Sequence, residues 1–148
     1  MAYHRFAVLT EQGESGINSP EFAALLASDV VFNGPFLMKS LRGNKEVTQR
    51  LLSDVYTIPA NIKYTHQLED NQGSTLFLWE ATFTGPDGRD FPLEGSIVIT
   101  EGEDGLIHEV TNYLRPLQVG GLLKEKMVKS IASVLPREYY DPTATGAN

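Results

Sequence analysis

The sequence predicts an α+β protein in which helices pack on one face of an antiparallel sheet. Two observations predict this class. Apolar residues follow a helical period up to about residue 58, and from residue 61 they alternate with a period of two. The alternating segments are separated by turns rich in Gly, Asp and Asn, which are typical of hairpins. Helices followed by a meander of strands form a two-layer α+β fold.

The first part of the chain carries the predicted helices. They cover residues 4–12, 19–28 and 43–58, and a short strand is predicted at 29–36. Ser19 is the expected N-cap of the second helix, because Pro20 suits the first helical position and Glu21 complements the helix dipole. In the third helix apolar residues recur every four positions, at Val47, Leu51 and Val55.

The second part of the chain carries the predicted meander. Its strands are expected at residues 61–68, 74–85, 91–101 and 106–114, and a C-terminal helix at 117–135. We assign residues 1–135 to a single domain, since a chain of 148 residues buries about two-thirds of its unfolded surface in one core. Residues 136–148 are expected to form a loosely ordered tail, although Tyr139 and Tyr140 hint that its first half packs on the domain.

Composition excludes several classes of function. A formal charge of −7 argues against binding nucleic acid or an anionic membrane surface. The chain has no cysteine, which removes disulfides, thiolate catalysis and cysteine-based metal sites. Its 3 histidines are scattered, so we expect no metal and no cofactor. The first 16 residues contain no long apolar run, so we expect no secretory signal and a cytoplasmic location.

Three stretches carry a family resemblance. They are "LLASDVVFNGP", "LRGNKEVTQRLL" and "GSIVITEGEDGLIHEVTNYLRPL". In this order and spacing the chain, over roughly residues 4–135, resembles the SnoaL-like branch of the nuclear transport factor 2-like superfamily. The resemblance implies a cone-shaped barrel, in which a strongly curved antiparallel sheet wraps around the N-terminal helices and a C-terminal helix follows. The resemblance also implies an apolar cavity between sheet and helices, and members of the family often form homodimers.

The resemblance does not imply one function. The superfamily includes isomerases, epoxide hydrolases, dehydratases, polyketide cyclases, ligand-binding domains and transport adaptors on one scaffold. Function therefore has to be argued from the residues that face the cavity.

Asn112 is the first candidate. In the SnoaL-like cyclases and the limonene epoxide hydrolase branch, an acidic residue five places after the strand's Ile acts as catalytic acid or base. Counting from Ile107, that place holds Asn112, which is followed by Tyr113 as in the hydrolases. A carboxamide donates and accepts hydrogen bonds but does not exchange a proton near neutral pH. Asn112 is then either a ligand contact or a polar group satisfied inside the core.

His66 and Tyr64 are the next candidates. Alternation along residues 61–68 predicts that they share the apolar face with Ile62 and Leu68. A histidine there is the best available general base, and the alternative is a histidine bonded to a neighbour at the barrel rim. Tyr64 either supplies a hydroxyl for binding or packs in the wall.

Trp79 identifies the inner face of the following strand. Phe77, Trp79, Ala81 and Phe83 share one face, and the aromatic face is expected to point inward. Glu80 then points outward, whereas the opposite phase of the strand would place its carboxylate in the cavity. His108 is expected at the end of a hairpin and Arg115 in an ion pair at the strand end.

Our leading hypothesis is that the protein binds a small, largely apolar organic molecule in an internal pocket. The residues expected to line this pocket are Tyr64, His66, Trp79, Phe83, Ile97 and Asn112. The first alternative is an enzyme of the isomerase, epoxide hydrolase or cyclase type, with His66 as general base and Asn112 and Tyr64 orienting the substrate. The second is a structural or interaction module without a ligand. Whether the protein is an enzyme, and which ligand it takes, stay open at this point.

Overall fold

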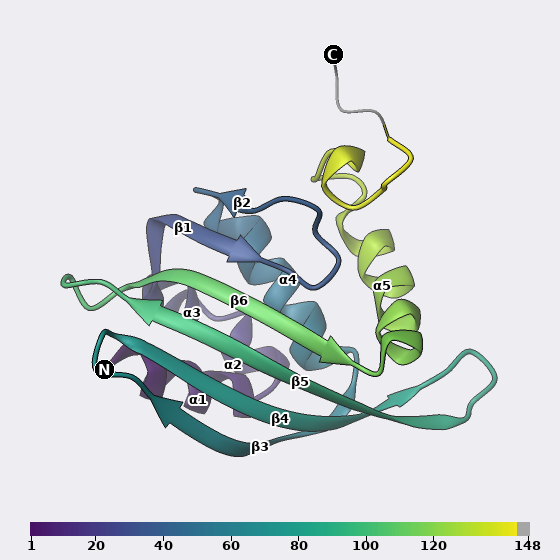
Figure 1. The fold of residues 1–148 in the computed structure, drawn as a ribbon, viewed down its shortest axis with the longest axis horizontal. Helices are drawn as coiled ribbons and strands as arrows, with labels where there is room; N and C mark the ends of the chain where they lie inside the picture. The colour runs from purple at the N-terminus through teal and green to yellow at the C-terminus, as the bar shows by residue number, and fades with distance from the viewer. Residues whose placement is uncertain (145–148) are drawn as a thin grey trace.

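The computed structural model describes residues 1–144, which form a curved sheet with helices packed on one face (Figure 1). Within these residues the sheet has 6 strands in the order β2-β1-β6-β5-β4-β3, so β2 and β3 are its edges and the sheet is not closed. The helices are α1 (Ala2–Glu11), α2 (Glu14–Ile17), α3 (Pro20–Leu25), α4 (Lys45–Thr57), α5 (Leu117–Ile131) and a 3-10 helix (Arg137–Tyr139). The strands are β1 (Leu26–Asn33), β2 (Leu41–Arg42), β3 (Ala60–Glu69), β4 (Ser74–Thr84), β5 (Asp90–Glu101) and β6 (Ile107–Arg115).

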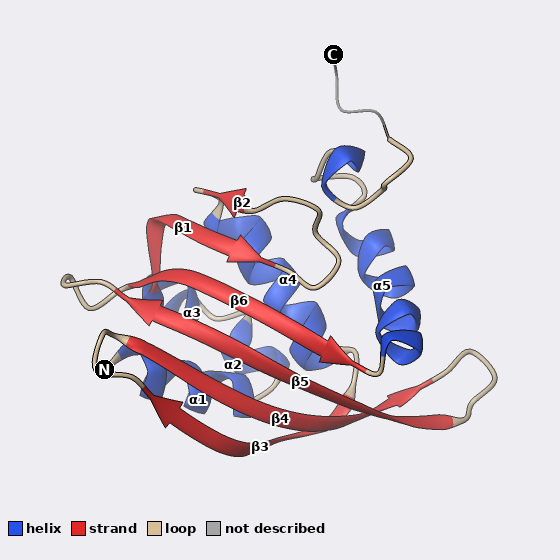
Figure 2. Ribbon diagram, viewed as in Figure 1, coloured by secondary structure: helices blue, strands red, loops and turns tan. Residues whose placement is uncertain are grey.

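Strands β3 to β6 form the predicted antiparallel meander, with α1–α4 behind it in Figure 2. Burial alternates along β4, so that Phe77, Trp79, Ala81 and Phe83 are buried on the side of the helices. Glu80 lies between them on the exposed outer face, opposite Glu94 of β5. The inner and outer faces of this strand are therefore the ones that its alternation predicts.

The pairing of β1 differs from the sequence-based expectation of a wholly antiparallel sheet. Strand β1 runs parallel to β6, with Phe32 opposite Val110, and antiparallel to the short strand β2. About 75 residues of chain separate β1 from β6, and no local pattern reports a pairing over that distance. The sheet is consequently mixed.

The boundary between α3 and β1 also differs from the prediction. The predicted start is confirmed: the Oγ of Ser19 accepts a hydrogen bond from the N–H of Phe22 at 3.1 Å, and Pro20 opens the helix. The helix ends at Leu25 rather than near residue 28, because Leu26 already pairs with Ile107 of β6. Pairing with the sheet outweighs the weak local preference of this segment for helix.

The core lies between the inner face of the sheet and the helices. Phe6 of α1 packs against Phe22, Tyr56 and Phe77 with ring centroids 5.5, 6.1 and 6.3 Å apart. Helix α5 packs against β5 and β6 and buries Leu123 and other apolar residues. Within residues 1–144, no helix is long and apolar enough to cross a membrane.

The first part of the predicted tail packs on the domain. Tyr140 is buried in the core, and the N–H of Met38 donates to the backbone carbonyl of Tyr139 at 2.7 Å. Residues 145–148, the rest of that tail, lie outside the described residues.

Trp79 occupies its place in the core because Gly95 has no side chain. The two residues are partners across β4 and β5. A Cβ atom added to Gly95 would lie 2.2 Å from Cζ2 and 2.8 Å from Nε1 of the indole. The ring of Trp79 therefore extends from β4 over the bare backbone of β5, towards β6.

This contact predicts that Gly95→Ala is destabilising. The added methyl group has to displace a fully enclosed ring, and overpacking of this kind costs about 1–3 kcal/mol of unfolding free energy. Urea unfolding followed by tryptophan fluorescence measures it directly, since Trp79 is the only tryptophan.

Gly121→Ala is the matched control. Gly121 lies in α5 with nothing within 4 Å of the added Cβ, so alanine there is expected to stabilise the helix by up to about 1 kcal/mol. Equal unfolding midpoints for Gly95→Ala and the unmodified protein would show that the indole does not rest on Gly95.

Candidate functional site

Asn112 lies on the inner face of the sheet and is almost completely buried. It sits on β6 opposite Ile97 of β5, and 1% of its surface is exposed. Neither its Nδ2 nor its Oδ1 has a hydrogen-bond partner among the described residues. Asn112 is thus a polar side chain in an apolar interior, with two donor protons and an acceptor oxygen unused.

An unpaired carboxamide in such a place is unfavourable. Burying an amide without a compensating hydrogen bond costs about 1–3 kcal/mol by protein mutational data. Buried polar groups of native proteins are therefore nearly always paired, and an exception calls for a partner such as a water molecule or a ligand. The sequence left open whether Asn112 is satisfied inside the core, and the protein atoms do not satisfy it.

The indole N–H of Trp79 is a second buried donor without a partner among residues 1–144. Because the ring lies over Gly95, this N–H sits above β5 rather than above its own strand β4. Gly95 pairs with Leu114 on β6, two positions along that strand from Asn112. Diagonal neighbours of this kind are about 7–8 Å apart. One small polar group between the two side chains could therefore contact both of them.

A third unpaired donor comes from the helix layer. The hydroxyl of Tyr56 on α4 has no partner among the described residues, and its ring centroid is 6.2 Å from that of Trp79. Burial raises the pKa of Tyr56 well above its usual value, and the neighbouring Tyr64 adds to the shift. Tyr56 is consequently a neutral hydrogen-bond donor at physiological pH, not a base.

Tyr64 lies beside this group with its hydroxyl engaged. Its OH is 2.5 Å from Oγ1 of Thr10 on α1, and Oγ1 also lies 3.0 Å from the carbonyl oxygens of Phe6 and Ala7. The proton of Thr10 is directed at those carbonyls, so Tyr64 is the donor to Thr10. Burial raises the pKa of Tyr64 to about 12.

The expectation that His66 shares the face of Tyr64 is wrong. The register of β3 shifts between the two residues: Tyr64 faces Trp79, whereas His66 faces Leu78 on the outer side of the sheet. A β-bulge of this kind adds one residue to a strand and reverses the alternation that follows it. The exposed His66 contacts only Thr65 among the described hydrogen bonds, with its Nδ1 3.0 Å from Oγ1.

The two remaining residues predicted for the pocket lie on the inner face of the sheet. Ile97 and Phe83 are buried on the inner face, Ile97 beside Asn112 and Phe83 towards α5, where the Nζ of Lys126 lies 5.2 Å from its ring centroid. The five predicted inner-face residues Tyr64, Trp79, Phe83, Ile97 and Asn112 therefore share one side of the sheet, and His66 is separated from them by the sheet itself.

The outer face carries a hollow of about 360 Å³ that crosses β3 to β6. The side chains around it include His66, Leu78, Glu80, Ser96, Tyr113 and Arg115. Arg115 forms the expected ion pair at the strand end, with its Nη1 3.1 Å from Oε2 of Glu94. In the described part of the chain, no group of three or more His, Asp or Glu side chains is placed to hold a metal ion.

Three residues of the inner site were not singled out from the sequence. Tyr56 continues the apolar stripe of α4 four positions after Leu52, a spacing that marks a buried residue but not a polar role. Gly95 interrupts an alternating strand, which is a signal for close approach of another group. Thr10 gives no signal of its own, because its partner Tyr64 is distant in sequence.

Comparison with solved structures finds similar chains along most of this one. A steroid delta-isomerase from Pseudomonas aeruginosa has a TM-score of 0.74 and 25% identity, and the match covers 89% of this chain and 90% of that one. An NTF2-like protein of unknown function from Burkholderia pseudomallei K96243 has a TM-score of 0.61 and 16% identity, with 82% and 96% covered. The epoxide hydrolase/cyclase-like enzyme SalBIII, which has a role in pyran ring formation in the polyether salinomycin, has a TM-score of 0.60 and 12% identity, with 77% and 90% covered. No model of a protein family matches the sequence, and neither does any curated protein.

The unpaired carboxamide predicts that Asn112→Leu stabilises the ligand-free protein. Leucine has a similar shape and no polar atoms, so the change removes a desolvation penalty of about 1–3 kcal/mol. Thermal or urea unfolding in ligand-free buffer gives the difference in unfolding free energy.

Asn33→Leu is the control for this prediction. Asn33 has partners: its Nδ2 donates to Oγ1 of Thr111 at 3.0 Å, and its Oδ1 accepts from Oγ of Ser40 at 2.5 Å. Loss of these bonds makes Asn33→Leu destabilising. If Asn112→Leu and Asn33→Leu are equally destabilising, Asn112 has hydrogen-bond partners in solution even without a ligand.

Proposed function

Since the chain is a member of the nuclear transport factor 2-like superfamily, we propose that it binds a small, largely apolar organic molecule between the sheet and the helices. The observation that carries the proposal is Asn112, buried with both polar atoms unpaired. In the proposed complex the carboxamide of Asn112 and the indole N–H of Trp79 hold a hydroxyl or carbonyl group of the ligand.

The walls of the interior favour an apolar body for this ligand. Trp79, Phe83 and Ile97 present aromatic and aliphatic surface on the sheet side, and Tyr56 presents an aromatic ring on the helix side. Ligand sites of this kind combine a mostly hydrophobic lining with a few polar groups that fix orientation.

Binding is favoured over catalysis by the protonation states of the inner groups. The steroid delta-isomerase and the cyclase-like enzyme show that similar chains include enzymes. General acid–base catalysis needs a group that titrates near the working pH and lies within hydrogen-bond reach of the reacting atom. Asn112 does not titrate, burial keeps Tyr56 and Tyr64 neutral, and His66 lies on the opposite face. An enzyme that uses His66 as general base would have to bind its substrate on the outer face.

The proposal predicts stabilisation by apolar compounds that carry one polar group. Cyclic ketones and alcohols should raise the melting temperature, and the corresponding hydrocarbons should do so less. At a concentration ten times Kd the expected gain is about 1.4 kcal/mol. The same compounds should change the emission of Trp79, the only tryptophan.

The variant Asn112→Leu tests whether the ketones bind at this site or elsewhere on the protein. The variant keeps the apolar walls and the indole N–H of Trp79 but loses the carboxamide, so the difference between ketones and hydrocarbons should become smaller. Equal stabilisation of the variant and the unmodified protein by the ketones would show that they bind elsewhere.

We further propose that the protein forms a homodimer through the outer face of its sheet. The helices cover the inner face, and the outer face presents Tyr113 and Leu68, which are 58% and 57% exposed, beside the half-buried Leu78. In a two-fold dimer the same surface meets itself, so its charges have to be self-complementary. Acidic Glu80 and Glu94 lie beside basic Lys63 and Arg115 on this face, which satisfies that condition.

The dimer predicts that Leu78→Glu gives a monomer. A carboxylate in the centre of the contact is desolvated without a partner, which opposes association. Sedimentation equilibrium should show one chain for Leu78→Glu and two for the unmodified protein. Met38→Glu changes an exposed apolar residue away from the sheet and should leave the dimer intact. A monomeric unmodified protein at millimolar concentration would exclude this interface.

A further inference from the structure

The pairing of β1 with β6 contains an interruption that centres on His108. Leu26 pairs with Ile107 and Val31 pairs with Glu109. Residues 27–30 of β1 therefore lie opposite a single residue of β6, His108. We refer to residues 27–30 as the β1 bulge.

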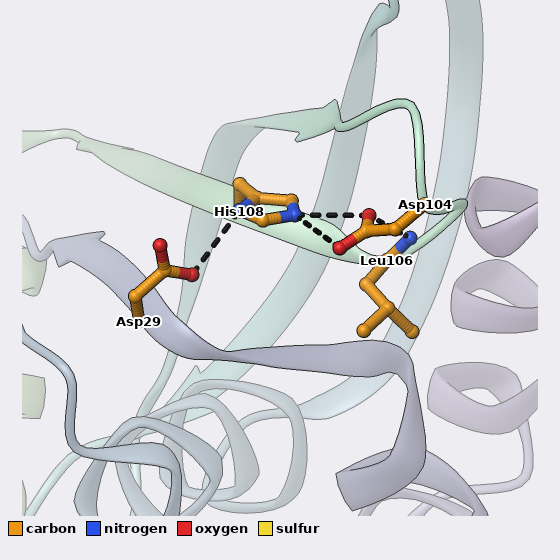
Figure 3. Close-up of polar contacts among 4 residues, drawn as sticks. All are labelled: Asp29, Asp104, Leu106 and His108. Carbon is orange, nitrogen blue, oxygen red and sulfur yellow. Dashed lines mark hydrogen bonds and ion pairs between the residues drawn. The ribbon is translucent and has the colours of Figure 1, made fainter.

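His108 joins the β1 bulge to the hairpin between β5 and β6 (Figure 3). Its Nδ1 is 3.2 Å from Oδ1 of Asp29 in the bulge. Its Nε2 is 2.9 Å from both carboxylate oxygens of Asp104 in the hairpin. The ring lies between the two carboxyl groups, and Gly102 leaves room for it, since a Cβ there would come within 2.6 Å of Cδ2.

This arrangement requires a charged imidazole. An ionised carboxylate only accepts hydrogen bonds, so each ring nitrogen that faces one has to carry a proton. Asp29 of β1 and Asp104 of the hairpin are the charged groups that contact the ring, while Glu109 bonds to Asn33 instead. The hydrogen bond to Asp104 and the negative charges of both carboxylates raise the pKa of His108 above 6.5.

We propose that His108 is a pH-sensitive latch, which holds the β1 bulge against the β5–β6 hairpin while protonated and releases it when deprotonated. A neutral imidazole has one N–H and one lone pair, so it can serve only one of the two carboxylates. Asp104 is the partner that stays, because its Oδ1 is fixed by the N–H of Leu106 at 3.0 Å. Asp29, with 78% of its side chain exposed, then faces a lone pair and turns to solvent.

Release of the latch loosens a wall of the interior. Ala27 and Val30 of the bulge are buried in the core, and the carbonyl of Val30 accepts the N–H of Gly43 at 2.9 Å. With the contact to Asp29 gone, the bulge keeps this backbone bond and its apolar packing but loses its tie to β6. Opening of the sheet between β1 and β6 thus becomes more frequent as the pH rises.

The direction of the pH effect follows from the pKa of His108. It is higher in the folded than in the unfolded chain, so the latch contributes its full stabilisation below pH 6.5 and loses it as the pH rises through the folded-state pKa. Because about a third of the His108 side chain is exposed, salt should weaken the contribution.

The experiment is a histidine titration by NMR, combined with amide hydrogen exchange. The chain has 3 histidines, so His4 and His66 serve as internal references for His108. We expect His108 to titrate above pH 6.5, and Asp29→Asn to lower its midpoint. Protection factors of residues 27–30, corrected for the intrinsic effect of pH, should fall above the midpoint in the unmodified protein and be low throughout in Asp29→Asn.

Asp87→Asn provides the control, because it also removes one negative charge but from the hairpin between β4 and β5. It should leave the titration of His108 and the protection of the bulge unchanged. The latch is overturned if Asp29→Asn leaves the midpoint of His108 unchanged, or if the protection of residues 27–30 is equal on the two sides of that midpoint.

Discussion

The contact between the indole of Trp79 and the bare backbone of Gly95 is the constraint on which the interior depends. A side chain at position 95 would occupy the ring's place, and the indole would have to leave β5. With glycine there, the ring spans from β4 towards β6 and brings its N–H to the same region as Asn112. The ring also contacts the helix layer through Tyr56, so that one residue connects sheet, helix and the candidate site.

The interior is otherwise a well-packed apolar core, which makes its polar atoms informative. Phe6, Phe22, Tyr56, Phe77 and Trp79 are all buried, and such a core is most stable without unpaired polar groups. The atoms of Asn112, Trp79 and Tyr56 that lack partners among the described residues reduce the stability of the ligand-free state. A ligand that pairs with them would recover that free energy. The unpaired polar groups therefore destabilise the ligand-free protein, and relief of this destabilisation favours binding. Functional sites commonly give up stability for function.

Much of the fold could be predicted from the sequence because it rests on local signals. The cap at Ser19, the stripe of α4 and the alternation of β4 each involve residues close together in the chain. The parallel pairing of β1 with β6 and the early end of α3 could not be predicted, since both depend on contacts between distant segments. The residues of the candidate site also divide into those that local signals predict and those that depend on distant contacts. Alternation placed Trp79, Phe83, Ile97 and Asn112 on one face, whereas the bulge at Thr65, set by pairing with β4, moved His66 to the other face.

In the proposed complex Asn112 and Trp79 hold the polar group of a ligand inside the domain. The most direct measurement is a titration of the ¹⁵N-labelled protein with a cyclic ketone, followed through the side-chain amide signals of Asn112 and the indole N–H signal of Trp79. If the ketone binds between these two side chains, both signals shift together and saturate at the same ketone concentration. Shifts confined to outer-face residues such as His66 and Tyr113, with the signals of Asn112 and Trp79 unchanged, would contradict it.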